Sequence, residues 1–296
     1  MQTNLSNLST RTITAVALIS ILSAVLLLSS IFCFGRWLAL ACAVVIVGMS
    51  AFEFACVCTA QSKNVTKRLT YFLILMVPAA AFLSLVSVTG LCDVPKVKAA
   101  MLSCVVNGTV LISLLGAVLY VIAAGARELE HSIEIAREIF VGIVLISLGG
   151  ASLLSLLLFE DLVRLVAWLV AVVSINDTCA YLFGSKVGGP RLAPLISPNK
   201  TISGSAAGLI CGVAAGQLLA FLLPIQRPAL EIIIVSLFVV VAAQLGDLSK
   251  SFIKRMNGVK DSGTLLPGHG GVLDRADGIL AAAPPVLFYY LVTLIL

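Results

Sequence analysis

The chain has 296 residues, of which 60% are hydrophobic and 11% are charged, whereas roughly 25% of the residues in an ordinary soluble domain are charged. This composition excludes a water-soluble globular protein and indicates an integral membrane protein that contacts the lipid bilayer. The formal net charge of +5 is distributed over several loops without interleaved aromatic residues, so we expect no nucleic-acid partner.

Long apolar runs dominate the chain. A helix needs about 20 apolar residues to cross about 30 Å of hydrocarbon, and its backbone groups satisfy one another in lipid. Runs of roughly this length lie at residues 12–34, 37–60, 69–91, 99–124, 138–158, 162–183, 203–223, 228–247 and 279–296. We therefore predict an all-α, polytopic integral membrane protein with about nine transmembrane helices, including the first run, which lacks a convincing cleavage site.

The two halves of the chain differ in polarity. Residues 1–160 have few polar groups inside their spans and predict a transmembrane scaffold that gives lipid access. Residues 161–296 carry polar blocks at the ends of their spans and are interpreted as a C-terminal catalytic domain. Its loops at residues 184–203 and 248–278 are joined by an out-and-back pair of predicted helices, which places both on one membrane face.

The Lys and Arg residues of the loops predict the orientation. With the N-terminus in the cytoplasm, 14 of the 19 Lys and Arg residues lie on the cytoplasmic side, in agreement with the positive-inside rule. The five on the other side are Arg36, Lys96, Lys98, Arg164 and Arg227. We expect a multi-pass protein of the cell (inner) membrane whose polar active site faces the cytoplasm.

Acidic residues of the first half have mostly structural interpretations. Glu53 lies between two phenylalanines, and a carboxylate at this depth should face the bundle or a watery cavity. We interpret it as satisfied by a neighbouring helix or as lying near the membrane interface, with a role in the lipid-facing part of the site as the alternative. The alternating charges of residues 127–138, with Glu134 and Glu138 one turn apart, favour a solvated helical face.

Two carboxylates of the second half lie at the boundaries of predicted spans. Asp247 ends the eighth span, and Asp274 precedes the ninth. Carboxylate oxygens suit Mg²⁺, which keeps several waters and shares its coordination with substrate phosphates, and two ions could clamp the attacking and leaving oxygens. We predict a magnesium site with one ion or two, the alternative being that the acids only pair with Arg255 and Arg275.

Cations and glycines in the same loops predict a polyanionic substrate, with anionic lipid headgroups as the alternative partner of the cations. The cations are Lys186, Arg191, Lys200, Lys254, Arg255, Lys260 and Arg275. Gly268, Gly270 and Gly271 surround His269, and backbone amides in such a segment can approach phosphate oxygens closely. Neither a Walker motif nor a Rossmann glycine motif is present.

An ordered set of motifs covers roughly the last 120 residues. The main run comprises Ser251-x-Ile253-Lys254-Arg255, Lys260-Asp261-Ser262-Gly263 and Leu266-Pro267-Gly268-His269-Gly270-Gly271-x-Leu273-Asp274-Arg275-x-Asp277. Supporting motifs are Asp177-Thr178-x-Ala180-Tyr181-x-x-Gly184, Ser197-Pro198-x-Lys200-Thr201 and Gly246-Asp247-Leu248. This set resembles the signature of the phosphatidate cytidylyltransferase (CDP-diacylglycerol synthase) family, which the N-terminal half resembles only in its hydrophobic helices.

The resemblance implies a nucleotidyltransferase of phospholipid biosynthesis. Such an enzyme transfers CMP from CTP to phosphatidic acid, gives CDP-diacylglycerol and pyrophosphate, requires Mg²⁺ and forms a homodimer in the membrane. By resemblance, the metal ligands are Asp247 and Asp274, and the other catalytic residues are Lys254, Arg255, His269 and Arg275. The substrate-binding residues are Asp177, Asn199, Lys200, Lys260, Asp261, Gly270, Gly271 and Asp277.

Two positions depart from the family pattern. Ser203 stands where the family often has an acid or an amide, and Lys250 stands where it often has a glutamate. The lysine reverses the charge three residues after Asp247. We expect it either to contact phosphate directly or to weaken the binding of metal.

Two other classes of function remain open. A membrane CTP-dependent transferase or kinase that acts on another lipid phosphate or a lipid alcohol would need much the same nucleotide site. A transporter of anionic solutes would show paired repeats or broken helices near the middle of the membrane, and neither is visible in the sequence. A CDP-alcohol phosphotransferase is disfavoured because its Asp-Gly-x-x-Ala-Arg segment is missing.

Overall fold

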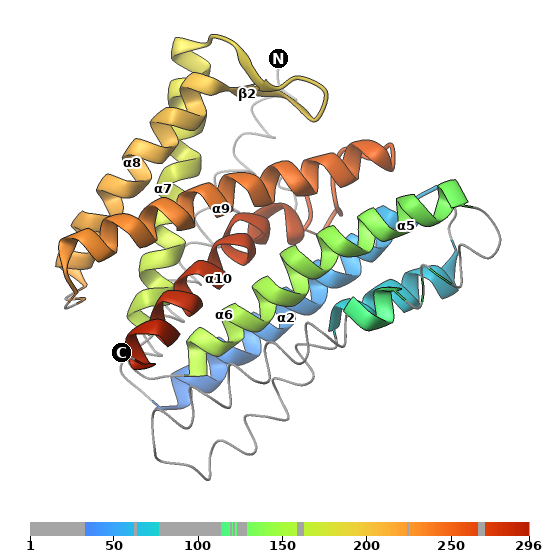
Figure 1. Ribbon diagram of the computed structural model, residues 1–296, viewed down its shortest axis with the longest axis horizontal. Helices are drawn as coiled ribbons and strands as arrows, with labels where there is room; N and C mark the ends of the chain where they lie inside the picture. Colours follow the sequence, from blue (N-terminus) through green and yellow to red (C-terminus); the bar gives the residue numbers. More distant parts are fainter. Residues whose placement is uncertain are drawn as a thin grey trace, which may run out of the picture.

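The computed structural model is built almost entirely of helices (Figure 1). It describes residues 33–61, 64–76, 114–118, 120, 122, 129–158, 163–223, 225, 227–265 and 270–295. The elements are α2 (Cys33–Cys58), α5 (Leu129–Gly142), a π-helical turn η1 (Ile143–Leu148), α6 (Gly149–Leu158), α7 (Val163–Val187), β1 (Arg191–Ala193), β2 (Ser197–Thr201), α8 (Ile202–Leu222), α9 (Ala229–Met256) and α10 (Leu273–Ile295). Residues 65–76 form a further helix.

Helices long and apolar enough to cross a membrane number six in the described residues. They are Trp37–Cys58, Ser132–Leu157, Arg164–Val187, Ile202–Leu222, Ala229–Met256 and Leu273–Thr293, and they correspond to six of the predicted runs. This result confirms the prediction of a helical protein with membrane-spanning segments. The predicted runs 12–34, 69–91 and 99–124 lie largely outside the described residues.

The boundaries of the last two predicted spans were wrong. Helix α9 continues to Met256, and α10 begins at Leu273, so both helices extend into the segment predicted as the loop 248–278. The length of the apolar run does not determine where α9 ends or where α10 begins. Lys254 and Arg255 in the last turn of α9 and Asp274 in the first turn of α10 interact favourably with the helix dipoles, and they continue the helices beyond the apolar stretch.

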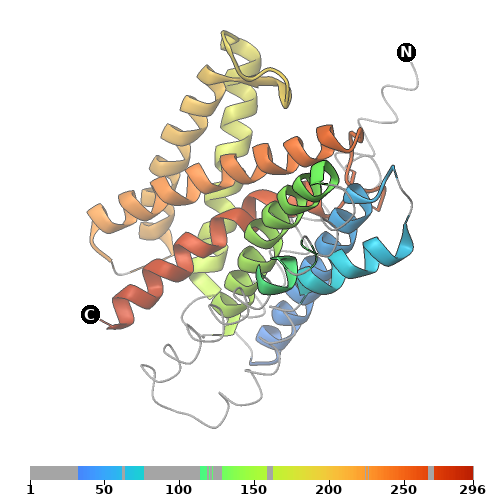
Figure 2. The same cartoon turned by 45° about the vertical axis from the view of Figure 1, so that its right-hand side comes forward.

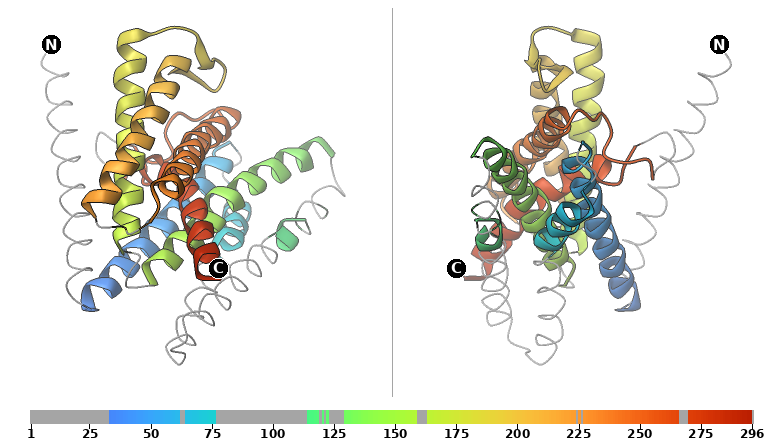
Figure 3. Two further views of the ribbon diagram at one scale, coloured as in Figure 1. Left: turned by 60° about the vertical axis from the view of Figure 1, so that its left-hand side comes forward. Right: turned by 90° about the vertical axis from the view of Figure 1, so that its right-hand side faces the viewer.

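A short hairpin is the one addition to the predicted all-α fold in the described part of the chain. Strands β1 and β2 pair antiparallel with Arg191 opposite Thr201 and Ala193 opposite Ser197. The Thr201 side chain then accepts a hydrogen bond from the Gly204 amide at 3.1 Å and caps the start of α8. The hairpin therefore connects α7 to α8, as the two views of Figure 3 show. The helix ends that it joins are those predicted to face the cytoplasm.

Helices α7 and α8 pack closely through glycines. Gly204, Gly208, Gly212 and Gly216 recur every four residues on α8 and are buried. A Cβ at Gly204 would lie 2.5 Å from the Ala180 carbonyl oxygen of α7. Small residues at this spacing let helix backbones approach each other, which brings the polar end of α7 beside the hairpin.

Helix α10 connects the parts of the bundle. It packs against α9 on one side and α6 on another, and Figure 2 shows α9 between the α7–α8 pair and α10. A Cβ at Gly246 of α9 would lie 2.4 Å from the Ala281 side chain, and a Cβ at Gly149 of α6 would lie 2.4 Å from the Leu280 carbonyl oxygen. This packing fixes the polar ends of α9 and α10 next to each other.

Candidate active site

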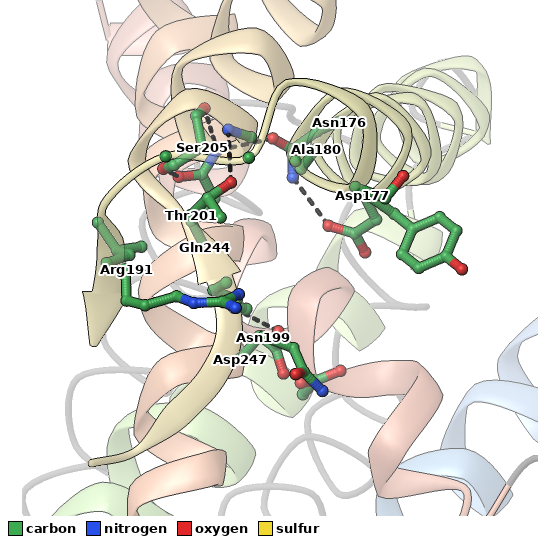
Figure 4. A pocket seen from close by; sticks show the side chains of 18 of the residues that line it. Asn176, Asp177, Ala180, Arg191, Asn199, Thr201, Ser205, Gln244 and Asp247 are labelled. Carbon is green, nitrogen blue, oxygen red and sulfur yellow. Dashed lines mark hydrogen bonds and ion pairs between the residues drawn. The ribbon is translucent and has the colours of Figure 1, made fainter. Parts of the chain in front are cut away.

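A cavity of about 670 Å³ opens at the polar ends of these helices. Side chains from α7, the hairpin, α8 and α9 surround it (Figure 4). Its lining includes the predicted site residues Asp177, Asn199, Lys200, Asp247, Asp274, Arg275 and Asp277. Residues separated by up to 100 positions in the sequence are thus brought to one place, as the motif pattern predicted.

Lys250 lies at the centre of a group of carboxylates beside this cavity. Its Nζ is 3.3 Å from Asp247 Oδ1, 3.3 Å from Asp274 Oδ1 and 2.5 Å from Asp277 Oδ2. Lys250 is 5% exposed. We refer to these four residues as the Lys250 cluster, and they tie the end of α9 to the start of α10.

Asp274 also organises the loop that precedes α10. Its Oδ1 accepts a hydrogen bond from Lys254 Nζ at 2.7 Å, and its Oδ2 accepts one from the Ser262 amide at 2.9 Å. The Gly271 amide donates to the same Oδ2 at 3.3 Å. Gly270 has a φ of +82°, and a Cβ there would lie 3.0 Å from Asp274 Oδ2, so both the backbone conformation and the space favour glycine.

Asp247 is the contact between the cluster and the hairpin. Its Oδ2 lies 2.5 Å from Nζ of Lys200, which is on β2, while Oδ1 faces Lys250. The side chains of Lys200 and Asp247 are 29% and 37% exposed. This ion pair is therefore accessible to a charged ligand in the cavity.

The predicted residue Asp177 forms another wall together with Asn176 and Gln244, which the sequence analysis did not assign to the site. Asn176 Nδ2 donates to Asp177 Oδ1 at 2.8 Å, and Gln244 Nε2 donates to Asn176 Oδ1 at 2.8 Å. Gln244 also contacts the side chain of Ser205. The available signal was the polar Gln244 one turn before Asp247 in an otherwise apolar helix, because a polar group at that depth needs partners.

Glu53 connects the N-terminal half to the site. It is 3% exposed, and its two carboxylate oxygens accept hydrogen bonds from the Val272 amide at 3.0 Å and the Leu273 amide at 2.8 Å. A negative charge at the start of α10 is favourable. Gly263 and Gly271 pack so closely that an added Cβ would lie within 2.6 Å of this carboxylate. The interpretation that a neighbouring helix satisfies Glu53 is confirmed.

Glu138 corrects the prediction of a solvated face at residues 127–138. It is 4% exposed and accepts hydrogen bonds from the Tyr71 hydroxyl at 2.7 Å and from Asn257 Nδ2 at 2.9 Å. The side chain of Ile135, on the same face of α5, is also buried. Charge alternation alone did not reveal that this face packs against the residue that ends α9.

The comparison with known proteins agrees with the geometry. Residues 9–294 match the cytidylyltransferase family. The chain belongs to the cytidylyltransferase family. A phosphatidate cytidylyltransferase of Brucella suis biovar 1 (strain 1330) is 49% identical over 119 residues, covering 40% of this chain and 43% of the relative. One of Staphylococcus haemolyticus (strain JCSC1435) is 41% identical over 125 residues, covering 42% and 48%. The chain thus spans less than half the length of these curated relatives.

Several residues that the resemblance assigned to the cytidylyltransferase site lie apart from the cluster. The Arg255 Nε donates to the Ile196 carbonyl oxygen in the turn of the hairpin at 3.3 Å. Lys260 and Asp261 are exposed and are not part of the cavity lining. His269 lies outside the described residues. Arg255, Lys260 and Asp261 are thus exposed residues outside the cavity lining.

The two departures from the family pattern have separate structural roles. The Ser203 hydroxyl donates to the Gly188 carbonyl oxygen and lies 3.1 Å from the Thr201 hydroxyl, which fastens the hairpin to the end of α7. Lys250 faces carboxylates and is absent from the lining of the cavity. Neither side chain lines the cavity in this structure.

The carboxylates of the site fit Mg²⁺ only in combination with substrate. In the described part of the chain, no three His, Cys, Asp or Glu side chains group as a metal site. Asp247 and Asp274 nevertheless each place an oxygen 3.3 Å from the same Lys250 Nζ, so one ion could reach both. Mg²⁺ is commonly held by one or two carboxylates, waters and substrate phosphates, and this donor set matches that pattern.

Proposed function

We propose that this protein is a phosphatidate cytidylyltransferase, which transfers CMP from CTP to phosphatidic acid and releases pyrophosphate. The observation that carries the proposal is the cavity lined by Lys200, Asp247 and Asp274 at the ends of apolar helices, where Lys200 pairs with Asp247 and Asp274 pairs with Lys254. Family membership and the names of the relatives support the same activity. The position at the helix ends suits a reaction between a soluble nucleotide and a lipid headgroup.

The reaction places few demands on acid–base chemistry. An oxygen of the phosphatidate phosphate attacks the α-phosphorus of CTP, and the bond between that phosphorus and the oxygen that bridges to the β-phosphate breaks. The attacking oxygen is already ionised near neutral pH, so no strong general base is required. The main barriers are the approach of two polyanions and the charge that develops on the leaving pyrophosphate.

The side chains of the site address these two barriers. Lys200 and Lys254 are held close to the cavity by Asp247 and Asp274 and are 29% and 13% exposed. Each can exchange its carboxylate partner for a phosphate oxygen, since charge-assisted hydrogen bonds to the two anions are similar in strength. We propose that Asp247 and Asp274 hold Mg²⁺. The bound ion would stabilise the negative charge that develops on the phosphates.

The proposal extends to the arrangement in the membrane. We infer nine spans, a scaffold in residues 1–160 and a catalytic domain in residues 161–296, with the site facing the cytoplasm from the inner membrane. The distribution of Lys and Arg supports this orientation. We also propose a homodimer. Exposed apolar side chains on α8, such as Ile210, Leu218 and Phe221, suit contact with lipid or with a second copy.

A labelling experiment tests the proposed activity. Purified protein in detergent receives Mg²⁺ and either [α-³²P]CTP or [γ-³²P]CTP, with phosphatidic acid or diacylglycerol as the acceptor. We expect lipid-soluble label only from [α-³²P]CTP with phosphatidic acid. Lipid-soluble label from [γ-³²P]CTP with diacylglycerol would instead identify a lipid kinase, and no lipid-soluble label under either condition would contradict both readings.

A further inference from the structure

Lys250 differs from the other lysines of the site in its position. Its side chain is 6% exposed and contacts three carboxylates, which come from two helices. It also lies 3.5 Å from the Asp274 carbonyl oxygen. Among the residues that the structure describes, Lys200 and Lys254 each pair with one carboxylate, and their side chains are more exposed.

This difference in burial predicts different behaviour when a polyanion enters. Lys200 and Lys254 can turn from their carboxylates to phosphate oxygens. Lys250, which is buried, would have to leave three carboxylates to do so, and separating a buried charge from its partners is costly. Lys250 therefore stays where it is while the other two lysines bind the substrate.

The charge of the occupied site then depends on Lys250. Once Lys200 and Lys254 contact phosphate, the Lys250 cluster contains three carboxylates and one ammonium group, which leaves two formal negative charges. One divalent cation balances them. Without the ammonium group, three carboxylates would crowd one buried place, and like charges at such distances repel strongly.

We propose that Lys250 is a fixed internal cation that takes the position of a metal ion among Asp247, Asp274 and Asp277, so that the site accepts a single divalent cation. The proposal rests on the proposed function in assuming that Asp247 and Asp274 can hold a divalent ion and that Lys200 and Lys254 bind substrate phosphate.

The test measures the number of ions bound per chain rather than the rate of catalysis. Three full-length proteins are purified in detergent: wild type, Lys250→Gln and Lys254→Gln. Bound Mn²⁺ is measured by equilibrium dialysis in the absence of nucleotide and added lipid. Free Mn²⁺ is detected by electron paramagnetic resonance. Lys254→Gln is the matched control because it also removes one positive charge next to Asp274. We expect Lys250→Gln to bind one more Mn²⁺ per chain than wild type and Lys254→Gln to bind the same number. Equal numbers in all three proteins, or the same gain in both variants, would overturn the proposal.

A second measurement covers the case in which Lys250→Gln folds poorly. Because a cation that binds only the folded state raises its stability, Mg²⁺ should raise the Tm of Lys250→Gln by about 3 °C more than that of wild type or Lys254→Gln. An equal rise in the three proteins would overturn the proposal. Neither measurement needs catalysis, so a failure to transfer CMP would contradict the proposed function and leave the role of Lys250 to be decided by Mn²⁺ binding.

Discussion

The α9–α10 wall of the cavity is held by buried ion pairs, whereas the hairpin wall is held by groups that water reaches. On the first wall, the side chains of Lys250 and Asp277 are 6% and 8% exposed. On the second, Lys200 is 29% exposed, and Arg191 and Asn199 are exposed as well. The first wall therefore provides a fixed arrangement of charge, and the second provides cations that can exchange partners when substrate binds.

The largest expected effect comes from breaking the contact between the two walls. Asp247→Asn removes the carboxylate that both Lys200 and Lys250 contact. We expect kcat/KM to fall by about 10²- to 10³-fold, as for the loss of one strong electrostatic contact in a site. Initial rates of CMP transfer measure the effect. Glu134→Gln, which neutralises an exposed carboxylate on α5, is the control, and equal activity of the two variants would contradict the account.

A smaller effect on activity is expected when the α9–α10 wall is weakened at Glu53, which does not line the cavity. Glu53→Ala leaves the Val272 and Leu273 amides at the start of α10 without their buried acceptor, which should cost about 1–3 kcal/mol of stability. Because the start of α10 carries Asp274, we expect kcat to fall while the KM for CTP stays within about twofold.

Thermal unfolding and steady-state kinetics measure both consequences, and Glu53→Gln should recover part of the loss because it keeps one acceptor oxygen. If Glu53→Ala lowered the Tm without any change in kcat, Glu53 would stabilise the bundle without positioning the site.

Sequence patterns identified several residues that line the cavity but not the contacts among them. Asp247, Asp274, Asp277 and Lys200 were identified from motifs, because phosphate and metal chemistry requires charged residues that are otherwise costly beside a membrane. The partners of Lys250 could not be predicted, since they depend on how α9 and α10 pack. The burial of Glu138 was missed for the same reason: its partners, Tyr71 and Asn257, are distant in sequence.

The sequence also predicted part of the fold. Apolar length identified six described spans, because the hydrocarbon thickness sets the length of a crossing helix. The ends of α9 and α10 were missed, since ion pairs and caps extend these helices beyond their apolar stretches. The hairpin was also missed, because its Ser-Pro-Asn-Lys-Thr strand (Ser197–Thr201) has no alternation of apolar residues.

A substitution on the hairpin wall should change substrate binding more than the rate of the chemical step. Lys200→Ala removes the ammonium group that we expect to move from Asp247 to phosphate. The KM for CTP should rise about tenfold, with a smaller change in kcat, because a cation that contacts the substrate in both the ground state and the transition state mainly contributes uniform binding. Steady-state kinetics over a range of CTP concentrations give both constants. A fall in kcat at constant KM would instead place Lys200 with the fixed wall.

The smallest effect is expected at the rim of the hairpin. Arg255 donates one hydrogen bond to the Ile196 carbonyl oxygen and is exposed, and such contacts contribute about 1 kcal/mol or less. Arg255→Gln should lower kcat/KM by about twofold to threefold, measured in the same assay. A loss as large as that of Asp247→Asn would mean that the Arg255 side chain leaves the Ile196 carbonyl oxygen and contacts the substrate directly.

The most direct test of the central claim is the release of pyrophosphate by purified protein that is given CTP, phosphatidic acid and Mg²⁺, compared with Asp274→Asn. Asp274 joins the lysines of the site to the loop before α10. The account predicts release that requires phosphatidic acid, stops when EDTA removes Mg²⁺ and collapses in Asp274→Asn while the protein remains folded. Release that persists in Asp274→Asn, or that does not depend on phosphatidic acid, would contradict it.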